Sequence, residues 1–508
     1  MAESLGLRIQ EEKFWDRQDL RAEIDRVFDI CHGCRLCFKF CGSFPLMFEE
    51  IDAVTERRRK EYLEAHPEIV EAAEKKREEA ARQGPREHDG ERAEGFGDEL
   101  PELQGHARDL TDEQIDRVVD LCFQCKLCYP NCPYTPPHEY AVDFPRLLLR
   151  WKAVRARERG IPLRSRLVRN TKLLGTLGSL APGLARRSLS NPVVRLAMEK
   201  TLGIHRKKDL PRFHGETFER WWKRRGGSRP EEPAPLREGI ETPTPLRVVF
   251  FATCLVNYHD PACGRAAVRV LEHNGVEVVY PPGQVCCGMP VIEGGDLERA
   301  ADYGRHNLEA LSEWVERGYE VVVPSPSCSL VLREEYPQLL GGEKADRIAG
   351  HTHDLCLYLY RIAREGRLKR DFRRKLDKIP YHVPCHLRAQ NVGFRARDLL
   401  GLVAEEVVAI QECSGHDGTW SMQVEHFEDS LHWGRKLFDE LRAAAGEKCT
   451  AACTDCALAG TQIRQATGLE PLHPVVVLAW AYGFEVGDVG KVLDSLAEAA
   501  ARGEKPAS

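Results

Sequence analysis

The sequence lacks any run approaching the roughly 20 consecutive apolar residues of a membrane-spanning helix. The nearest candidate, residues 173–184, is short and interrupted by glycine. Residues 1–20 are charged and contain neither an apolar segment nor a twin-arginine motif, so we expect no export signal. These absences predict a cytoplasmic protein that is either soluble or held peripherally on the inner face of the cell membrane.

Glycine motifs for nucleotide binding and a strong charge of one sign are also missing. No G-x-G-x-x-G or Walker-type sequence stands between a strand and a helix, so we expect a partner to hold any flavin or nicotinamide. The formal net charge of -6 and the isoelectric point near 6.3 give no general attraction to nucleic acid. The 508 residues, of which 42% are hydrophobic, suffice for about three globular domains.

Cysteine, in contrast, is abundant: the 19 cysteines fall in clusters with short, regular spacings, which in a chain of this size indicate metal binding more often than disulfides. Two runs in the N-terminal part each have the spacing C-x2-C-x2-C-x3-C. Three such cysteines let one looped turn hold three irons of a cubic cluster, while the fourth leaves on a helix and reaches the other cluster. The sequence therefore predicts one [4Fe-4S] cluster on Cys31, Cys34, Cys37 and Cys132, and another on Cys122, Cys125, Cys128 and Cys41.

From residue 246 the sequence alternates between strands and helices, and most of the predicted strands end near a cysteine. The order occurs twice, which indicates a diverged internal repeat whose copies could pack about a pseudo-twofold axis. Strands that alternate with helices predict parallel sheets, and the ligands would gather at one edge of each sheet. The predicted strands are residues 247–252, 276–280, 320–323, 380–383 and 405–410, and the predicted helices are residues 265–274, 297–317 and 427–445.

Each copy of this repeat supplies four thiols, enough for one further iron-sulfur centre, so we expect one or two such centres. The adjacent Cys286 and Cys287 can ligate different irons of a cluster, and Gly288 permits the tight turn beside them. In the second copy Ser414 stands where the first has its second cysteine. Buried structural cysteines or a zinc site are the alternatives. The candidate ligands are Cys254, Cys286, Cys287, Cys328, Cys385, Cys413, Cys453 and Cys456.

Other polar residues of this half give weaker signals. Cys263, Cys356 and Cys449 have no counterpart in the opposite copy, so we interpret them as core or surface thiols. His416 and Asp417, in a glycine loop of the second copy, are a candidate proton-relay pair.

A basic stretch joins the two halves. Residues 146–225 contain 22 Lys or Arg against 5 Asp or Glu, interleaved with Leu, Val and Trp. This connector could dock on anionic lipid or an acidic subunit, or it could pack its leucine face on a neighbouring domain. The predicted domains are a helical module at 1–145 with a charged insert at about 50–110, the connector and a hinge at 146–245, α/β domains at 246–375 and 376–490, and a tail at 491–508.

Together these motifs resemble the iron-sulfur subunit of anaerobic glycerol-3-phosphate dehydrogenase and, more widely, the heterodisulfide-reductase-like family with cysteine-rich CCG domains. The resemblance runs through nearly the whole chain apart from the charged insert. Besides the two N-terminal cysteine motifs, it rests on Leu-Leu-Gly at 173–175, Leu-Gly-Ile-His at 202–205, Cys254-Leu-Val-Asn-Tyr, Cys286-Cys287-Gly288, Ser327-Cys328, Glu334-Glu335-Tyr336-Pro337, Pro384-Cys385-His386 and Gly418-Thr419-Trp420.

The resemblance implies a multidomain α and α/β protein, with an α-helical ferredoxin module followed by two CCG domains whose cysteines ligate clusters. It implies an electron-transfer subunit between a flavoprotein dehydrogenase and the membrane quinone pool. In heterodisulfide reductase such domains hold noncubane clusters that cleave a disulfide, and here Ser325 and Ser414 depart from that cysteine pattern. The alternatives are a thiol-disulfide reductase, a soluble reductase partner of a rubrerythrin-like di-iron peroxidase, and a non-redox scaffold that binds zinc.

Overall fold

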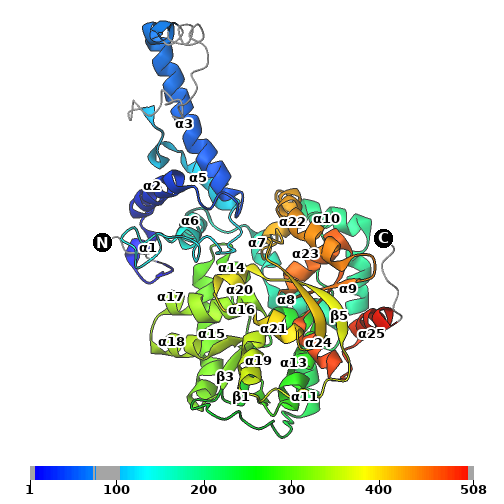
Figure 1. Cartoon of the computed structure of the whole chain (residues 1–508). Coiled ribbons are helices and arrows are strands. Elements are labelled where there is room, and N and C mark those ends of the chain that lie inside the picture. Colours follow the sequence, from blue (N-terminus) through cyan, green and yellow to red (C-terminus); the bar gives the residue numbers. More distant parts are fainter. Residues whose placement is uncertain (1–5, 73–74, 76–102, 502–508) are drawn as a thin grey trace.

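A computed structural model describes residues 6–72, 75 and 103–501 of the chain. It shows a helical N-terminal module from which one long helix projects, and a larger α/β body with connector helices packed on it (Figure 1). Of the charged insert, residues 73–74 and 76–102 lie outside the described residues. Within the described ranges, no helix combines the length and apolar character needed to cross a membrane.

The N-terminal module is built on amphipathic helices. Leu20, Ile24 and Phe28 recur at helical spacing and bury one face of α2 against α3. Residues 144–154 of α6 pack into the same core, so the first turns of the predicted connector belong structurally to this module. The elements of the module are α1 (Glu12–Trp15), α2 (Arg17–Cys34), α3 (Ser43–Ala65), η2 (Ala107–Asp109), α5 (Asp112–Asp120) and α6 (Phe144–Arg159).

The α/β body contains two four-stranded sheets in which all neighbouring strands are parallel. The strand orders β2-β1-β3-β4 and β6-β5-β7-β8 are the same topology, which confirms the predicted internal repeat. The strands β4, β7 and β8 were not predicted, because their sequences, Thr-His-Asp, Ala-Ala-Cys-Thr and Glu-Pro-Leu, lack the continuous apolar β-branched run seen in β1 and β3. The strands are β1 (Arg247–Phe250), β2 (Glu277–Val279), β3 (Glu320–Val323), β4 (Thr352–Asp354), β5 (Leu376–His382), β6 (Ala404–Ile410), β7 (Ala451–Thr454) and β8 (Glu470–Leu472).

The two copies share one hydrophobic core around a pseudo-twofold relationship. Helix α13 (Pro261–His273) contacts α24 (Pro474–Ala481), and α19 (Leu355–Arg364) contacts α21 (Arg395–Leu400). In their own copies, α13 and α21 follow the first strand, and α19 and α24 follow the last, so the two contacts are equivalent. Every side chain of α24 is buried, as expected of a helix that is apolar all round.

The remaining helices cover the sheets. The expected tail at 491–508 is corrected in part: residues 491–501 continue α25, which packs on the second copy and accepts a 2.8 Å hydrogen bond at Asp494 Oδ1 from Trp480 Nε1. These helices are α12 (Cys254–Tyr258), α14 (Met289–Ile292), α15 (Leu297–Glu316), α16 (Pro326–Leu330), η3 (Val331–Glu335), α17 (Tyr336–Leu340), α18 (Glu343–Gly350), α20 (Cys385–Ala389), η4 (Trp420–Met422), α22 (Phe427–Ala445), α23 (Ala457–Thr467) and α25 (Asp488–Ala501).

The rest of the connector forms short helices: α7 (Leu163–Val168), α8 (Thr171–Leu180), α9 (Pro182–Leu189), α10 (Pro192–Leu202) and α11 (Phe218–Arg225). The side chains of Asn170 and Asn191 cap α8 and α10. Helix α11 buries Phe218 in the core of the α/β body. In contrast, α7 to α10 leave large apolar side chains more than half exposed: Leu163, Leu177, Leu180, Leu184 and Val193.

Candidate metal centres

The first predicted thiol group forms where α2 ends. Cys31 and Cys34 lie in its last turn, and Arg35 takes a left-handed conformation (φ 54°) that turns the chain toward Cys37. Burial raises the pKa of Cys31 well above its usual range, and the neighbouring thiolates of Cys37, Cys132 and Cys34 raise it further. The structure thus brings together the four cysteines predicted to hold the first cluster. We call Cys31, Cys34, Cys37 and Cys132 group I.

Group II comprises Cys41, Cys122, Cys125 and Cys128, all buried. Burial raises the pKa of Cys128 well above its usual range, and the neighbouring thiolates of Cys125, Cys122 and Cys41 raise it further. Two residues between these cysteines, Gln124 and Lys126, have φ of 53° and 60°, which curls the loop tightly. The side chain of Gln124 donates to Cys122 Sγ at 3.3 Å.

Group III comprises Cys254, Cys286, Cys287 and Cys328 of the first copy. Hydrogen bonds link the Cys254 and Cys286 thiols and the Cys287 and Cys328 thiols. The left-handed Gly288 (φ 99°) makes the expected turn after the cysteine pair.

Neighbouring residues fix the backbone and the thiols of group III. Tyr336 donates its hydroxyl to the Cys287 carbonyl at 2.8 Å, and Asn307 donates to the Cys286 carbonyl at 3.2 Å. Thr171 of the connector helix α8 hydrogen-bonds to group III thiols. The connector therefore contacts a candidate metal centre directly.

Group IV comprises three cysteines of the second copy. Burial raises the pKa of Cys385 well above its usual range, and the neighbouring thiolates of Cys456 and Cys413 raise it further. Backbone amides point at two of the sulfurs: Gly415 N lies 3.2 Å from Cys413 Sγ, and Ala459 N lies 3.5 Å from Cys456 Sγ. Such N–H···S contacts tune iron-sulfur centres.

Cys453, the fourth ligand predicted for this copy, is not brought to group IV. It lies within β7, fully buried in the apolar core. Burial raises the pKa of Cys453 most, and the nearby charges of Asp455 and Cys449 raise it further. No group IV thiolate is among these charges. The strand continues through Thr454, so the period-2 alternation of side chains directs Cys453 into the core.

The four groups lie in a row. The Cys37 thiolate of group I is among the neighbouring charges that raise the pKa of Cys128 in group II. Cys385 and Cys413 of group IV pack against the core of the N-terminal module that contains group II. Cys328 of group III is among the charges acting on Cys456 of group IV. This succession was not predicted, because it depends on how the module docks on the α/β body.

An apolar cavity of about 290 Å³ opens at group III. All four group III cysteines and Cys456 line one part of it. Apolar side chains of the connector also line it: Leu167, Leu174, Leu189, Met198, Leu202 and Leu210.

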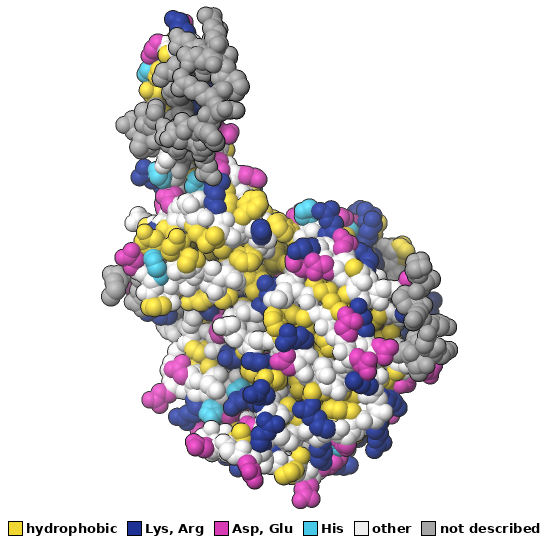
Figure 2. Space-filling view, in the orientation of Figure 1, with side chains coloured by type: hydrophobic (Ala, Val, Ile, Leu, Met, Phe, Trp, Pro, Cys, Tyr) yellow, Lys and Arg dark blue, Asp and Glu magenta, His cyan; other side chains and the backbone are white. Residues whose placement is uncertain are grey.

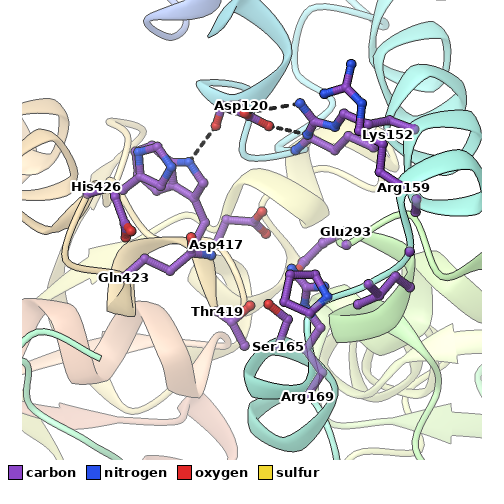
Figure 3. Close-up of a pocket in the computed structure, with 18 residues that line it drawn as sticks. Asp120, Lys152, Arg159, Ser165, Arg169, Glu293, Asp417, Thr419, Gln423 and His426 are labelled. Atoms are coloured by element: carbon purple, nitrogen blue, oxygen red, sulfur yellow. Dashed lines mark hydrogen bonds and ion pairs between the residues drawn. The ribbon is translucent and has the colours of Figure 1, made fainter. Parts of the chain in front are cut away.

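A polar cavity of about 420 Å³ lies at the junction of the module, the connector and both copies. Figure 3 shows labelled side chains from α6, the connector and loops of both copies converging on it. Glu293 and Thr419 line both cavities. No motif marked Glu293 in the sequence, because its partner Asp417 belongs to the other copy of the repeat.

Known proteins match these regions. The family model described as a cysteine-rich domain, CCG, matches residues 248–333 and 379–459, and the citrate utilization protein B Fer4-like domain matches residues 93–160. The chain is 27% identical over 322 residues to an anaerobic glycerol-3-phosphate dehydrogenase subunit of Escherichia coli (strain K12), covering 63% of this chain and 77% of that protein. It is 28% identical over 247 residues to "Lactate utilization protein A 2" of Bacillus cereus (strain AH820), covering 46% of this chain and 98% of that protein. These matches confirm the resemblance and the two CCG domains.

Proposed function

We propose that this protein with two CCG domains is an electron-transfer subunit, which carries electrons from a flavoprotein dehydrogenase through a row of iron-sulfur centres to a quinone. The observation that carries the proposal is the row of cysteine groups, which runs from the N-terminal module to an apolar cavity. The relative from Escherichia coli, named as a subunit of a dehydrogenase, supports it.

The thiol groups fit iron-sulfur centres. Crowded, buried thiolates raise one another's pKa, so holding several of them charged in one place requires a bound cation. Groups I and II would each hold a [4Fe-4S] cluster, and group III a further centre. Group IV would hold another through three cysteines, and Cys453 would have to leave the core of β7 to join it. When bound, these centres supply one-electron transfer.

The electron donor would dock at group I. The cysteines of group I are only partly buried, whereas those of group II are buried. Leu36 and Phe38 flank Cys37 and are 67% and 56% exposed. Figure 2 shows hydrophobic side chains gathered on the visible face of the N-terminal module. An exposed apolar patch beside a redox centre is a suitable docking surface for the flavoprotein.

The electron acceptor would bind in the apolar cavity at group III. A volume of about 290 Å³ is near the lower end of the range for small-molecule sites, and an apolar lining suits a quinone ring. The connector helices that wall this cavity also expose Leu177, Leu180 and Leu184, with Arg186 and Arg187 beside them on α9. Such a surface favours peripheral attachment to anionic lipid, the source of the quinone.

Metal analysis tests the proposal. Iron and acid-labile sulfide would be measured on protein purified without oxygen, together with EPR spectra. About sixteen irons per chain, with signals lost in Cys287→Ser, would support centres in both halves, and quinol formation by the reduced protein would support the acceptor. About eight irons with zinc in the α/β body would contradict the path through the CCG domains.

A further inference from the structure

The two cavities share two lining residues, Thr419 and Glu293, which directly follows α14. This carboxyl is 9% exposed and lines both the polar cavity and the apolar cavity at group III. The polar cavity faces solvent, since Arg159 and Glu425 in its lining have side chains more than half exposed. Glu293 therefore stands between water and the place where we propose that a quinone binds.

A hydrogen-bonded partner faces this carboxyl from the second copy. The carboxyl groups of Glu293 and Asp417 share a hydrogen bond, which requires one of them to be protonated. Among the described residues, no amine, amide or hydroxyl donates to Oε2 of Glu293. A Cβ at position 418 would lie 1.7 Å from this oxygen, so Gly418 leaves the space that the carboxyl occupies.

The cations around the pair come from three other elements, and the thiolates of Cys122, Cys385 and Cys413 also interact with Asp417. Lys152 on α6 and Arg169 after α7 face both carboxyls, and Lys126 faces Asp417. Despite these cations, burial, reinforced by Asp417, raises the pKa of Glu293 well above its ordinary value. Burial also raises the pKa of Asp417 to about 6. At neutral pH Glu293 thus keeps its proton, while the carboxylate of Asp417 can accept another proton.

We propose that Glu293 and Asp417 conduct protons from the polar cavity to a quinone in the apolar cavity. The inference rests on the proposed function and deepens it. A quinone becomes a quinol by taking two electrons, which a centre held by the group III cysteines would supply, and two protons on its oxygens. Glu293 gives each proton to a quinone oxygen, Asp417 reprotonates Glu293, and water in the polar cavity reprotonates Asp417.

The variants Glu293→Gln and Asp417→Asn remove the two transfer groups and keep their size. Glu425→Gln is the matched control, because this exposed carboxyl lines the polar cavity but not the apolar one. Quinol formation by the reduced protein should fall by about 100-fold or more in Glu293→Gln and stay unchanged in the control. Reduction of ferricyanide, which takes an electron without a proton, should stay unchanged in all three.

Two further readouts separate proton transfer from a structural role. The infrared absorption of protonated carboxyls should be weaker in Glu293→Gln than in wild type, while the affinity for a non-reducible quinone analogue stays the same. Added formate, a small proton carrier, should restore part of the quinol formation in Glu293→Gln.

The outcomes distinguish this inference from the proposed function. Wild type that reduces no quinone would overturn both. Wild type that forms quinol, with Glu293→Gln and Asp417→Asn equally fast, would overturn the proton route alone. Loss of EPR signals or of analogue binding together with the activity would assign Glu293 a structural role and also overturn it.

Discussion

Replacing Glu335 with glutamine should loosen the attachment of the group II loop to the first CCG domain. Glu335 is fully buried in η3 and accepts hydrogen bonds from Lys126 and, at 3.1 Å, from Arg146 Nη2. Lys126 lies between Cys125 and Cys128, so this ion group joins the N-terminal module to the α/β body. Burial opposes the charge, yet Arg146 and Lys126 lower the pKa of Glu335 to about 2, so it is ionised at neutral pH.

The magnitude follows from what the variant leaves behind. Glu335→Gln keeps the shape but leaves two buried cations without their shared carboxylate, and breaking a buried ion pair in this way costs about 3–5 kcal/mol. Arg146 retains Asp143 at 3.0 Å, so the lower end of this range applies. We expect the free energy of unfolding to fall by about 3 kcal/mol.

The assay is anaerobic urea unfolding followed by tryptophan fluorescence, with Glu334→Gln as the neighbouring control. The Glu334 side chain is 34% exposed and lies 3.7 Å from Arg146, so its loss should cost less than about 1 kcal/mol. If the two variants unfolded at the same urea concentration, the argument that burial makes the Glu335 ion group important would be refuted.

Three other predictions concern the centres and the surface. Cys456→Ser should abolish the EPR signal of the group IV centre, whereas Cys453→Ser should keep it, because Cys453 lies in the core of β7. Changing Leu177, Leu180 and Leu184 together to glutamine should weaken binding to anionic vesicles in a flotation assay by about 100-fold, since each leucine contributes about 1 kcal/mol on burial. The control Leu236→Gln in the hinge should leave this binding unchanged. Gly418→Ala should slow quinol formation without changing ferricyanide reduction, because its methyl group would displace the Glu293 carboxyl.

Sequence patterns predicted the longer elements and the repeated cysteines well. The predicted strand at 320–323 and helix at 427–445 have the same bounds as β3 and α22, because a continuous β-branched run and a long amphipathic period are strong local signals. The row of thiol groups and the Glu293–Asp417 pair could not be predicted, since both arise where separate segments dock. Cys453 shows the converse: its place among the four thiols of the second copy suggested a ligand, but its position within β7 directs the side chain into the core.

The equivalence of the α13–α24 and α21–α19 contacts has a consequence for proteins with a single CCG domain. The two copies meet through the same helices on each side, which is the geometry of a symmetric homodimer enclosed in one polypeptide. A lone domain of this kind would expose the apolar face that here lies in the shared core. Such proteins should therefore assemble as pairs through this face, and fusion of two copies in one chain makes the pairing independent of protein concentration.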